Sequence, residues 1–375
     1  MVKIIGKRFT TGMLALLFLA ASGVDLRAQG GPPATPDNWR DGTLVVVSSE
    51  AAEALLIDPV TGWLLGRFPT GPDPREVALS PDGRYAFVTS YGWIPGAADL
   101  ESGGEGSRYG AAASRGSGSQ SQGVTVLDLL ERRVHAVFQP GQYRHLQGIR
   151  VGEDGRRLWM TTEADSGIVE LDAHTGEVKM LWKTGGADPS TLTLTRDSRR
   201  IFVANTGSNS VTMIDRVTVV PRRIETGPMP LGLALSDDER ELWVANSGDH
   251  TVSVIDTRRL REVERFPSGG REPIRLEFRP GGHEVWVSHR GSRELTVLDV
   301  ASAGVLSHIS IDGEPRSLTF SDDGALAFVS VPRGHRVDVI DVATHEVIGS
   351  LDEATDPAGL VWSAQGETDR AFPHF

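Results

Sequence analysis

Charged side chains that could bind a ligand recur at equivalent places along this sequence. Eight of them are our candidates for a ligand-binding site: Arg75, His145, Glu163, Asp188, Arg275, His289, Arg316 and Asp356. The arginines could hold a carboxylate or phosphate group through paired hydrogen bonds. The two histidines, with the nearby carboxylates, could form a divalent-metal site or an acid–base pair. The alternative, that these charges pair with one another as a solvated rim, stays open.

Known catalytic motifs do not account for these residues. His283, Glu284 and His289 resemble the zinc motif HExxH, but the histidines are six residues apart in a predicted strand pair instead of four apart on a helix. The sequence has no GxSxG, Walker or GxGxxG motif. The absence of cysteine excludes covalent haem attachment. We therefore assign no residue to a metal, and a divalent metal is the one cofactor left open.

The composition indicates many short strands and a partner that is not nucleic acid. The 43 glycines and 21 prolines favour frequent turns over long helices. The formal net charge of −12 would repel a phosphate backbone. Both features agree with an all-β protein.

A strand that ends in Leu-Asp or Ile-Asp is repeated seven times. Its aspartates are Asp58, Asp128, Asp172, Asp215, Asp256, Asp299 and Asp341. Five of the six intervals lie between 41 and 44 residues, the length of one four-stranded propeller blade, and the first interval is 70. Because an active site needs a singular arrangement, we interpret these seven copies as structural residues that accept hydrogen bonds from turn amides.

A second strand upstream of each aspartate begins with a large aromatic residue. These residues are Phe87, Trp159, Phe202, Trp243, Trp286 and Phe328. Asp-Gly pairs such as Asp82-Gly83 precede several of them and predict tight hairpins. We expect the aromatic column to fill the space between neighbouring sheets.

The two ends of the repeat region complement each other. Residues 41–363 form the predicted domain, whose first unit lacks an inner strand, and residues 357–362 supply one. The pattern predicts a seven-bladed β-propeller with four antiparallel strands per blade, closed by pairing of this C-terminal inner strand with N-terminal strands. An open solenoid is the alternative, but it needs polar capping repeats.

The phrases FVTS, FVAN and WVAN, each followed by a strand of the type VTVLD, resemble the YVTN repeat of YncE-like seven-bladed β-propellers. The resemblance covers about residues 42–363. It implies the fold and an exported protein, and it says little about activity. Some similar propellers are linked to quinoprotein catabolism or electron-transfer partners, and others are lactonases or lyases.

The segments outside the repeats carry further expectations. Residues 1–28 have the basic start, short apolar run and small residues of a secretory signal, cleaved after Gly23 or Ala28, although an uncleaved anchor is an alternative. Residues 29–40 form a flexible leader, and 364–375 a C-terminal tail. We expect a periplasmic or secreted monomer with no membrane span after cleavage.

The long first interval contains an insertion rich in glycine, alanine and serine at residues 92–122. It joins the second and third strands of one unit and should rise from the face that carries the candidate site. Trp93 and Tyr109 could act there as a lid or meet a partner, whereas the composition of much of the segment favours disorder.

Three hypotheses for function follow. The first is a non-catalytic binding or scaffold protein that engages a small molecule or a protein at its channel face. The second is a lactonase- or lyase-like enzyme with a divalent metal in the central channel. The third, implied by the resemblance alone, is an accessory to a periplasmic quinoprotein dehydrogenase.

Overall fold

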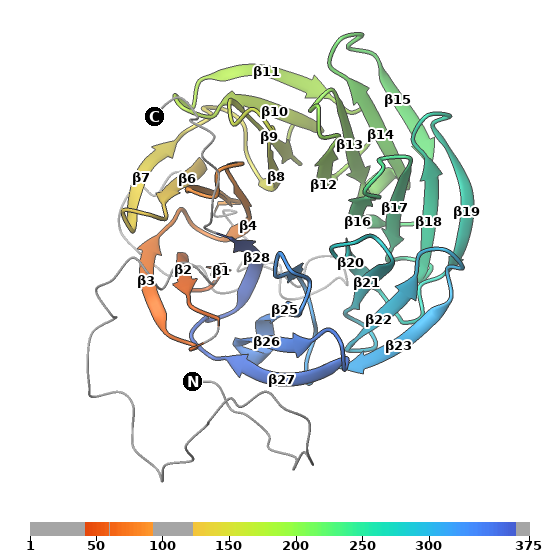
Figure 1. The fold of residues 1–375 in the computed structure, drawn as a ribbon. Helices are drawn as coiled ribbons and strands as arrows, with labels where there is room; N and C mark the ends of the chain where they lie inside the picture. The colour runs from red at the N-terminus through yellow and green to blue at the C-terminus, as the bar shows by residue number, and fades with distance from the viewer. Residues whose placement is uncertain (1–41, 60, 93–122, 365–375) are drawn as a thin grey trace, which may run out of the picture.

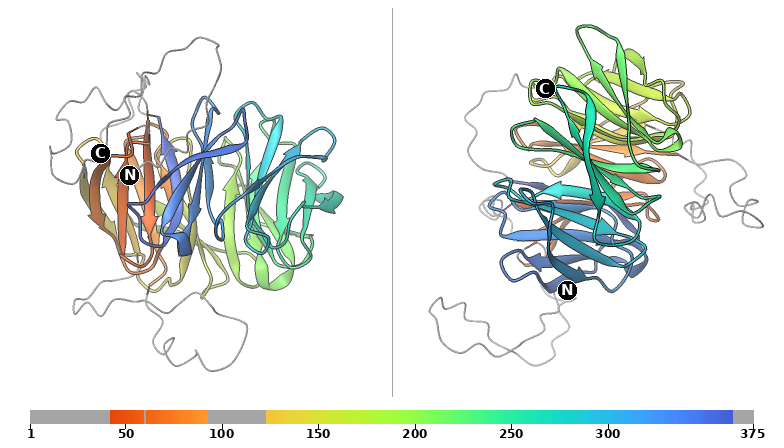
Figure 2. Two further views of the ribbon diagram at one scale, coloured as in Figure 1. Left: turned by 90° about the horizontal axis from the view of Figure 1, so that it is seen from below. Right: turned by 90° about the vertical axis from the view of Figure 1, so that its right-hand side faces the viewer.

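The computed structural model describes residues 42–59, 61–92 and 123–364. Within them the chain forms seven sheets of four antiparallel strands arranged in a ring (Figure 1), which confirms the predicted fold. The side views show the strands of the blades running between the two faces of this ring (Figure 2). The signal, leader, most of the tail, and the insertion with Trp93 and Tyr109 lie outside the described residues.

Each of the first three blades runs outward from an innermost strand near the ring axis. Blade 1 consists of β28 (Pro357–Ser363), β1 (Thr43–Ser48), β2 (Glu53–Ile57) and β3 (Leu64–Pro69). Blade 2 consists of β4 (Pro74–Leu79), β5 (Tyr85–Ser90), β6 (Gly123–Asp128) and β7 (Arg133–Phe138). Blade 3 consists of β8 (Leu146–Val151), β9 (Arg157–Thr162), β10 (Gly167–Asp172) and β11 (Val178–Lys183).

The other four blades follow the same order. Blade 4 consists of β12 (Pro189–Leu194), β13 (Arg200–Asn205), β14 (Ser210–Asp215) and β15 (Pro221–Glu225). Blade 5 consists of β16 (Pro230–Leu235), β17 (Glu241–Asn246), β18 (Thr251–Asp256) and β19 (Arg261–Pro267). Blade 6 consists of β20 (Pro273–Phe278), β21 (Glu284–His289), β22 (Glu294–Asp299) and β23 (Val305–Ser310). Blade 7 consists of β24 (Leu318–Phe320), β25 (Leu326–Val331), β26 (Arg336–Asp341) and β27 (Glu346–Leu351).

Helical structure is confined to two short turns in the described residues, η4 (Thr206–Ser208) and η5 (Pro332–Gly334). In the part of the chain that the structure describes, no helix has the length and apolar character needed to cross a membrane.

Local chemistry explains the hairpins within each blade. Between β4 and β5 the chain turns at Asp82-Gly83, where Gly83 has a φ of +70° that a residue without a Cβ adopts freely. The Ser80 amide donates to the Tyr85 carbonyl over 2.8 Å, and the Asp82 carboxylate accepts from the Arg84 amide over 3.1 Å. The turn is therefore specified by a few neighbouring residues, as expected for Asp-Gly.

The ring closes where the two ends of the described chain meet. β28 pairs antiparallel with β1, so that Leu44 lies opposite Trp362 and Val45 opposite Val361. Blade 1 therefore combines one C-terminal strand with three N-terminal strands, as predicted. Pairing these strands leaves no exposed inner edge at the junction.

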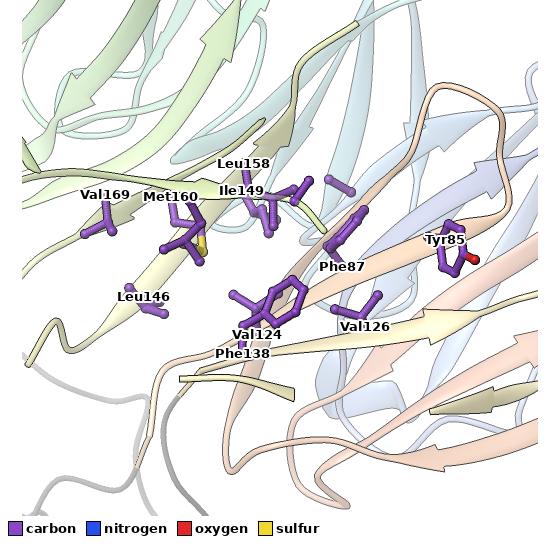
Figure 3. Packing of buried hydrophobic residues seen from close by; sticks show 13 residues of the cluster. Tyr85, Phe87, Val124, Val126, Phe138, Leu146, Ile149, Leu158, Met160 and Val169 are labelled. Carbon is purple, nitrogen blue, oxygen red and sulfur yellow. The ribbon is translucent and has the colours of Figure 1, made fainter. Parts of the chain in front are cut away.

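Large side chains fill the space between neighbouring blades. The six predicted aromatic residues are at most 1% exposed. Phe87 of blade 2, for example, packs in one cluster with Ile149 and Met160 of blade 3 (Figure 3). Blade 1 carries Val45 at the equivalent position, where it packs with Val88 of blade 2. The expected inter-sheet core is therefore present around the ring.

The seven repeated aspartates stabilise turns. In every blade the carboxylate accepts a hydrogen bond from the amide three residues later, for example from Thr218 to Asp215 over 3.2 Å. The amide of Val217 also donates to Asp215, and this bond is the main reason why the pKa of that carboxyl lies below its usual range. The structure thus supports the structural interpretation of these residues.

Removal of one buried aromatic side chain should destabilise the ring strongly. We expect Trp286→Ala to lower the free energy of unfolding by about 3–5 kcal/mol, because Trp286 is 0% exposed and truncation leaves a cavity between blades 6 and 7. Trp63→Ala is the matched control, since Trp63 is 44% exposed. Denaturant unfolding followed by circular dichroism measures both, and equal losses would contradict the packing described.

Candidate functional site

Two loops of each blade lie on one face of the ring, as expected from the sequence. In six blades the loop that enters the inner strand is joined to the loop that follows the second strand by a backbone hydrogen bond, for example 3.0 Å from Tyr91 to Asp73 in blade 2 and 3.3 Å from Glu163 to His145 in blade 3. Blade 7 has Pro332 at the donor position, and proline has no amide hydrogen to donate. We call this side the mouth face. Asp73 and His145 have φ of 50° and 55°, and the equivalent residues of four further blades share this left-handed conformation. The backbone is therefore repeated, and chemical differences come from the side chains.

Irregular pairing at the start of the inner strands displaces the residues that could contact a ligand. The pairing of β4 with β5 shifts between Pro74 and Val77, and that of β8 with β9 between Leu146 and Ile149. Such bulges bend a strand and redirect its side chains. Arg75, Glu76 and Gln147 lie within these two bulges.

Five side chains from blades 2 and 3 form one connected group, which we call the mouth cluster: Arg75, Tyr91, His145, Gln147 and Glu163. The Tyr91 hydroxyl and the Gln147 amide both donate to Oε2 of Glu163, the amide over 2.9 Å. The rings of Tyr91 and His145 are stacked, with centroids 4.6 Å apart and planes 13° apart. The guanidinium carbon of Arg75 lies 4.9 Å from the Tyr91 ring centroid. The contacts hold all five side chains in place.

Charges next to the mouth cluster balance it in part. Arg75 forms a 2.5 Å ion pair with Asp73. Burial raises the pKa of Asp73 above its usual value, Arg75 and Arg316 oppose that shift, and Asp356 adds to it. Burial also raises the pKa of Tyr91 well above its usual range, and the hydrogen bond to Glu163 adds to this effect, so the hydroxyl remains a donor. Arg316 and Asp356 therefore act electrostatically on this part of the mouth.

A second charged group lies deeper, on the ring axis, and we call its members the axial charges: Glu76, Arg150, Arg275 and Glu277. Arg275 of β20 forms an ion pair with Glu76 of β4. These strands belong to blades 6 and 2, which are as far apart as two blades of seven can be, so the pair crosses the axis. Arg150 of β8 and Glu277 of β20 interact electrostatically with both members.

Two predicted site residues are placed away from these groups. His289 is 0% exposed and lies inside the blade, where its Nε2 is 3.0 Å from the Ser268 hydroxyl. Asn205 and Asn246 occupy the same strand position in blades 4 and 5 and bond to hydroxyls in the same way. Asp188 is exposed at the blade 4 rim. The structure brings together Arg75, His145 and Glu163 and leaves these two outside.

Part of the mouth face fits the solvated-rim alternative. Arg290 pairs with Glu272 over 2.9 Å, and Arg333 pairs with Glu314 over the same distance. In residues 42–92 and 123–364, apart from residue 60, no group of three histidine, aspartate or glutamate residues could hold a metal ion.

The sequence analysis missed Arg150 and Glu277 entirely. Both are the fifth residue of an inner strand, a position that other blades fill with Ala78, Thr193 or Ala234. Two charged residues among small ones at one register position are the signal that could have revealed them. Tyr91 and Gln147 also stand at mouth positions, but their contacts depend on neighbouring blades.

Comparison with known proteins supports the fold described above. A family model described as "YNCE-like beta-propeller" matches residues 157–318. This segment therefore matches the YncE-like β-propeller family. The match confirms the resemblance seen in the repeated phrases, and the ring extends the YncE-like architecture to seven blades. No curated protein matches the chain in sequence.

Several solved structures share the fold of this propeller. Periplasmic gluconolactonase PpgL of Pseudomonas aeruginosa is 18% identical, with a TM-score of 0.66 over 87% of this chain and 99% of that one. Hydrazine synthase of Kuenenia stuttgartiensis is 19% identical, with a TM-score of 0.58 over 73% and 78%. The dihydro-heme d1 dehydrogenase NirN is 17% identical, with a TM-score of 0.59 over 91% and 78%. At these identities the likeness shows the fold alone.

The buried histidine of blade 6 generates a pH prediction. Burial lowers the pKa of His289 to about 4, below its ordinary value of 6.5, so the unfolded chain binds the extra proton first as the pH falls. Between these values this residue should reduce the free energy of unfolding by about 1.4 kcal/mol per pH unit of acidification. His289→Asn, which copies blades 4 and 5, should remove that slope.

Thermal and denaturant unfolding from pH 7 to pH 4 measures the effect. The control is His283→Asn, because His283 is exposed and its replacement should keep the wild-type slope. An unchanged slope in His289→Asn would show that His289 titrates normally in the folded protein.

Proposed function

We propose that this chain is an exported, non-catalytic binding protein that holds a small hydroxylated molecule at the mouth cluster. The observation that carries the proposal is the state of Glu163. Its Oε2 accepts two hydrogen bonds from Tyr91 and Gln147, whereas its Oε1 has no hydrogen bond or ion pair with any described residue. A fixed carboxylate with one oxygen left over is suited to accept a hydrogen bond from a ligand hydroxyl.

The surrounding charges disfavour an anionic ligand. Asp73, Glu163 and Asp356 contribute three negative charges near the site, against two positive charges from Arg75 and Arg316. A strongly anionic molecule would therefore meet net repulsion, in line with the charge of −12 for the whole chain. The imidazole of His145, held flat against Tyr91, offers a further polar edge to the same molecule. A neutral sugar or polyol combines the required hydroxyls with the absence of charge.

The side-chain contacts within the mouth cluster support a role in binding. Side-chain contacts between two blades hold the mouth cluster together, and side chains fixed in this way lower the entropic cost of binding. The signal-like N-terminus supports export to the periplasm or beyond. We further propose that the protein works as a monomer with a small molecule as its partner. Among fold neighbours, one is named as a periplasmic gluconolactonase and another as a dehydrogenase, so the fold by itself serves more than one role.

A screen of neutral sugars and polyols by thermal shift tests the proposal, because a ligand that binds the folded state raises its melting temperature. For the best compound, calorimetry should show that Glu163→Gln weakens binding by about 10- to 100-fold, the worth of a hydrogen bond to a charged group. Glu272→Gln, at the blade 6 rim, should bind as the wild type does.

Three results would contradict the proposal. One is a screen in which no compound binds, and another is a Glu163→Gln variant that binds the best compound as tightly as the wild type does. The third is conversion of the bound compound by the purified protein, detected by NMR, which would favour the enzymatic alternative.

A further inference from the structure

The axial charges contain one cation, Arg150, and one anion, Glu277, that attract each other electrostatically but form no direct ion pair in the described part of the chain. The Arg150 guanidinium donates to the carbonyl of its own neighbour Ile149 over 2.8 Å and forms no ion pair with a described residue. Glu277 has neither a hydrogen bond nor an ion pair to its side chain among the described residues. Glu76 and Arg275, by contrast, are paired with each other. Opposite charges that attract each other across the axis without direct contact need an explanation.

The burial of Arg150 and Glu277 makes the lack of a direct ion pair energetically costly. Arg150 and Glu277 belong to blades 3 and 6, on opposite sides of the axis, and both lie deep in the molecule while keeping part of their surface accessible. Burial lowers the pKa of Arg150 and raises the pKa of Glu277, so each environment disfavours the charged form. A charge that lacks direct contact with an opposite charge in such a place destabilises the fold, and the attraction between Arg150 and Glu277 compensates this only in part.

We propose that the axial charges bind a small zwitterion that carries a carboxylate and an ammonium group. Arg150 takes the carboxylate, because a guanidinium matches its two oxygens. Glu277 takes the ammonium group from the opposite side of the axis. The Glu76–Arg275 ion pair stands beside both and keeps the net charge of the group at zero, which a zwitterion leaves unchanged. This site is separate from the mouth cluster and does not depend on the function proposed there.

A series of ω-amino acids of increasing length tests which separation between the carboxylate and the ammonium group fits the site best. The probes are glycine, β-alanine, 4-aminobutyrate and 5-aminovalerate, with acetate and propylamine as single-charge controls, each titrated by calorimetry into the full protein. We expect one member of the series to bind best and the single-charge compounds to bind at least about 10-fold more weakly, because each lacks one charge-assisted bond.

Substitutions at Arg150 and Glu277 test whether these two residues bind the zwitterion. Arg150→Gln and Glu277→Gln should each weaken the best zwitterion by about 10- to 100-fold. Arg333→Gln, which breaks a rim ion pair with Glu314, should leave it unchanged. Glu163→Gln separates the two sites, because it should affect the sugar or polyol and not the zwitterion.

Stability of the ligand-free protein gives a second test that needs no ligand. If Glu277 is an unpaired charge kept for binding, Glu277→Gln should melt at the wild-type temperature or above it. A lower melting temperature would mean that Glu277 is a structural partner of Arg150 and would overturn the proposal. Absence of binding by every zwitterion, or binding as tight as that of the wild type in Arg150→Gln and Glu277→Gln, would overturn it as well.

Discussion

Strand β28 comes from the end of the described chain and pairs with β1 from its beginning, opposite Leu44 and Val45. This antiparallel ladder is the constraint on which the ring depends. Each other blade is made of consecutive strands and could form from local hairpins, but blade 1 requires two segments more than 300 residues apart. Closing such a loop costs conformational entropy, which the β1–β28 hydrogen bonds and the packing of Trp362 against Phe328 offset.

Ring closure also determines where chemistry can occur. Because the blades share one backbone plan, seven equivalent positions face the axis and seven face the mouth, and most of them carry structural residues. Among the positions that differ from their counterparts, Glu163 at the mouth and Arg150 and Glu277 on the axis form no ion pair with a described residue. A repeated scaffold thus confines function to a few substitutions within an otherwise uniform core.

The sequence predicted the fold well because each unit carries its own signals. The spacing of the strand-end aspartates, the buried aromatic residues such as Trp243 and the strand at Pro357 together indicated a closed seven-bladed ring. The site was predicted only in part, because contacts between blades depend on side-chain reach. Arg75, His145 and Glu163 do belong to one group, in which each contacts Tyr91. His289, by contrast, resembled a mouth residue in the sequence and lies in the core, at a position that blades 4 and 5 fill with asparagine. Arg275 reaches across the axis to a partner that no local pattern could indicate.

The most direct test of this account is the stability of two truncated chains. A chain that ends after Ala364 retains β28 and should unfold cooperatively at the wild-type denaturant midpoint. A chain that ends after Asp356 lacks β28, exposes the edge of β1 and should lose the cooperative transition or shift it to much lower denaturant. If the chain that ends after Asp356 unfolds like the intact protein, blade 1 does not close the ring, and the axial arrangement of Glu76, Arg150, Arg275 and Glu277 is contradicted.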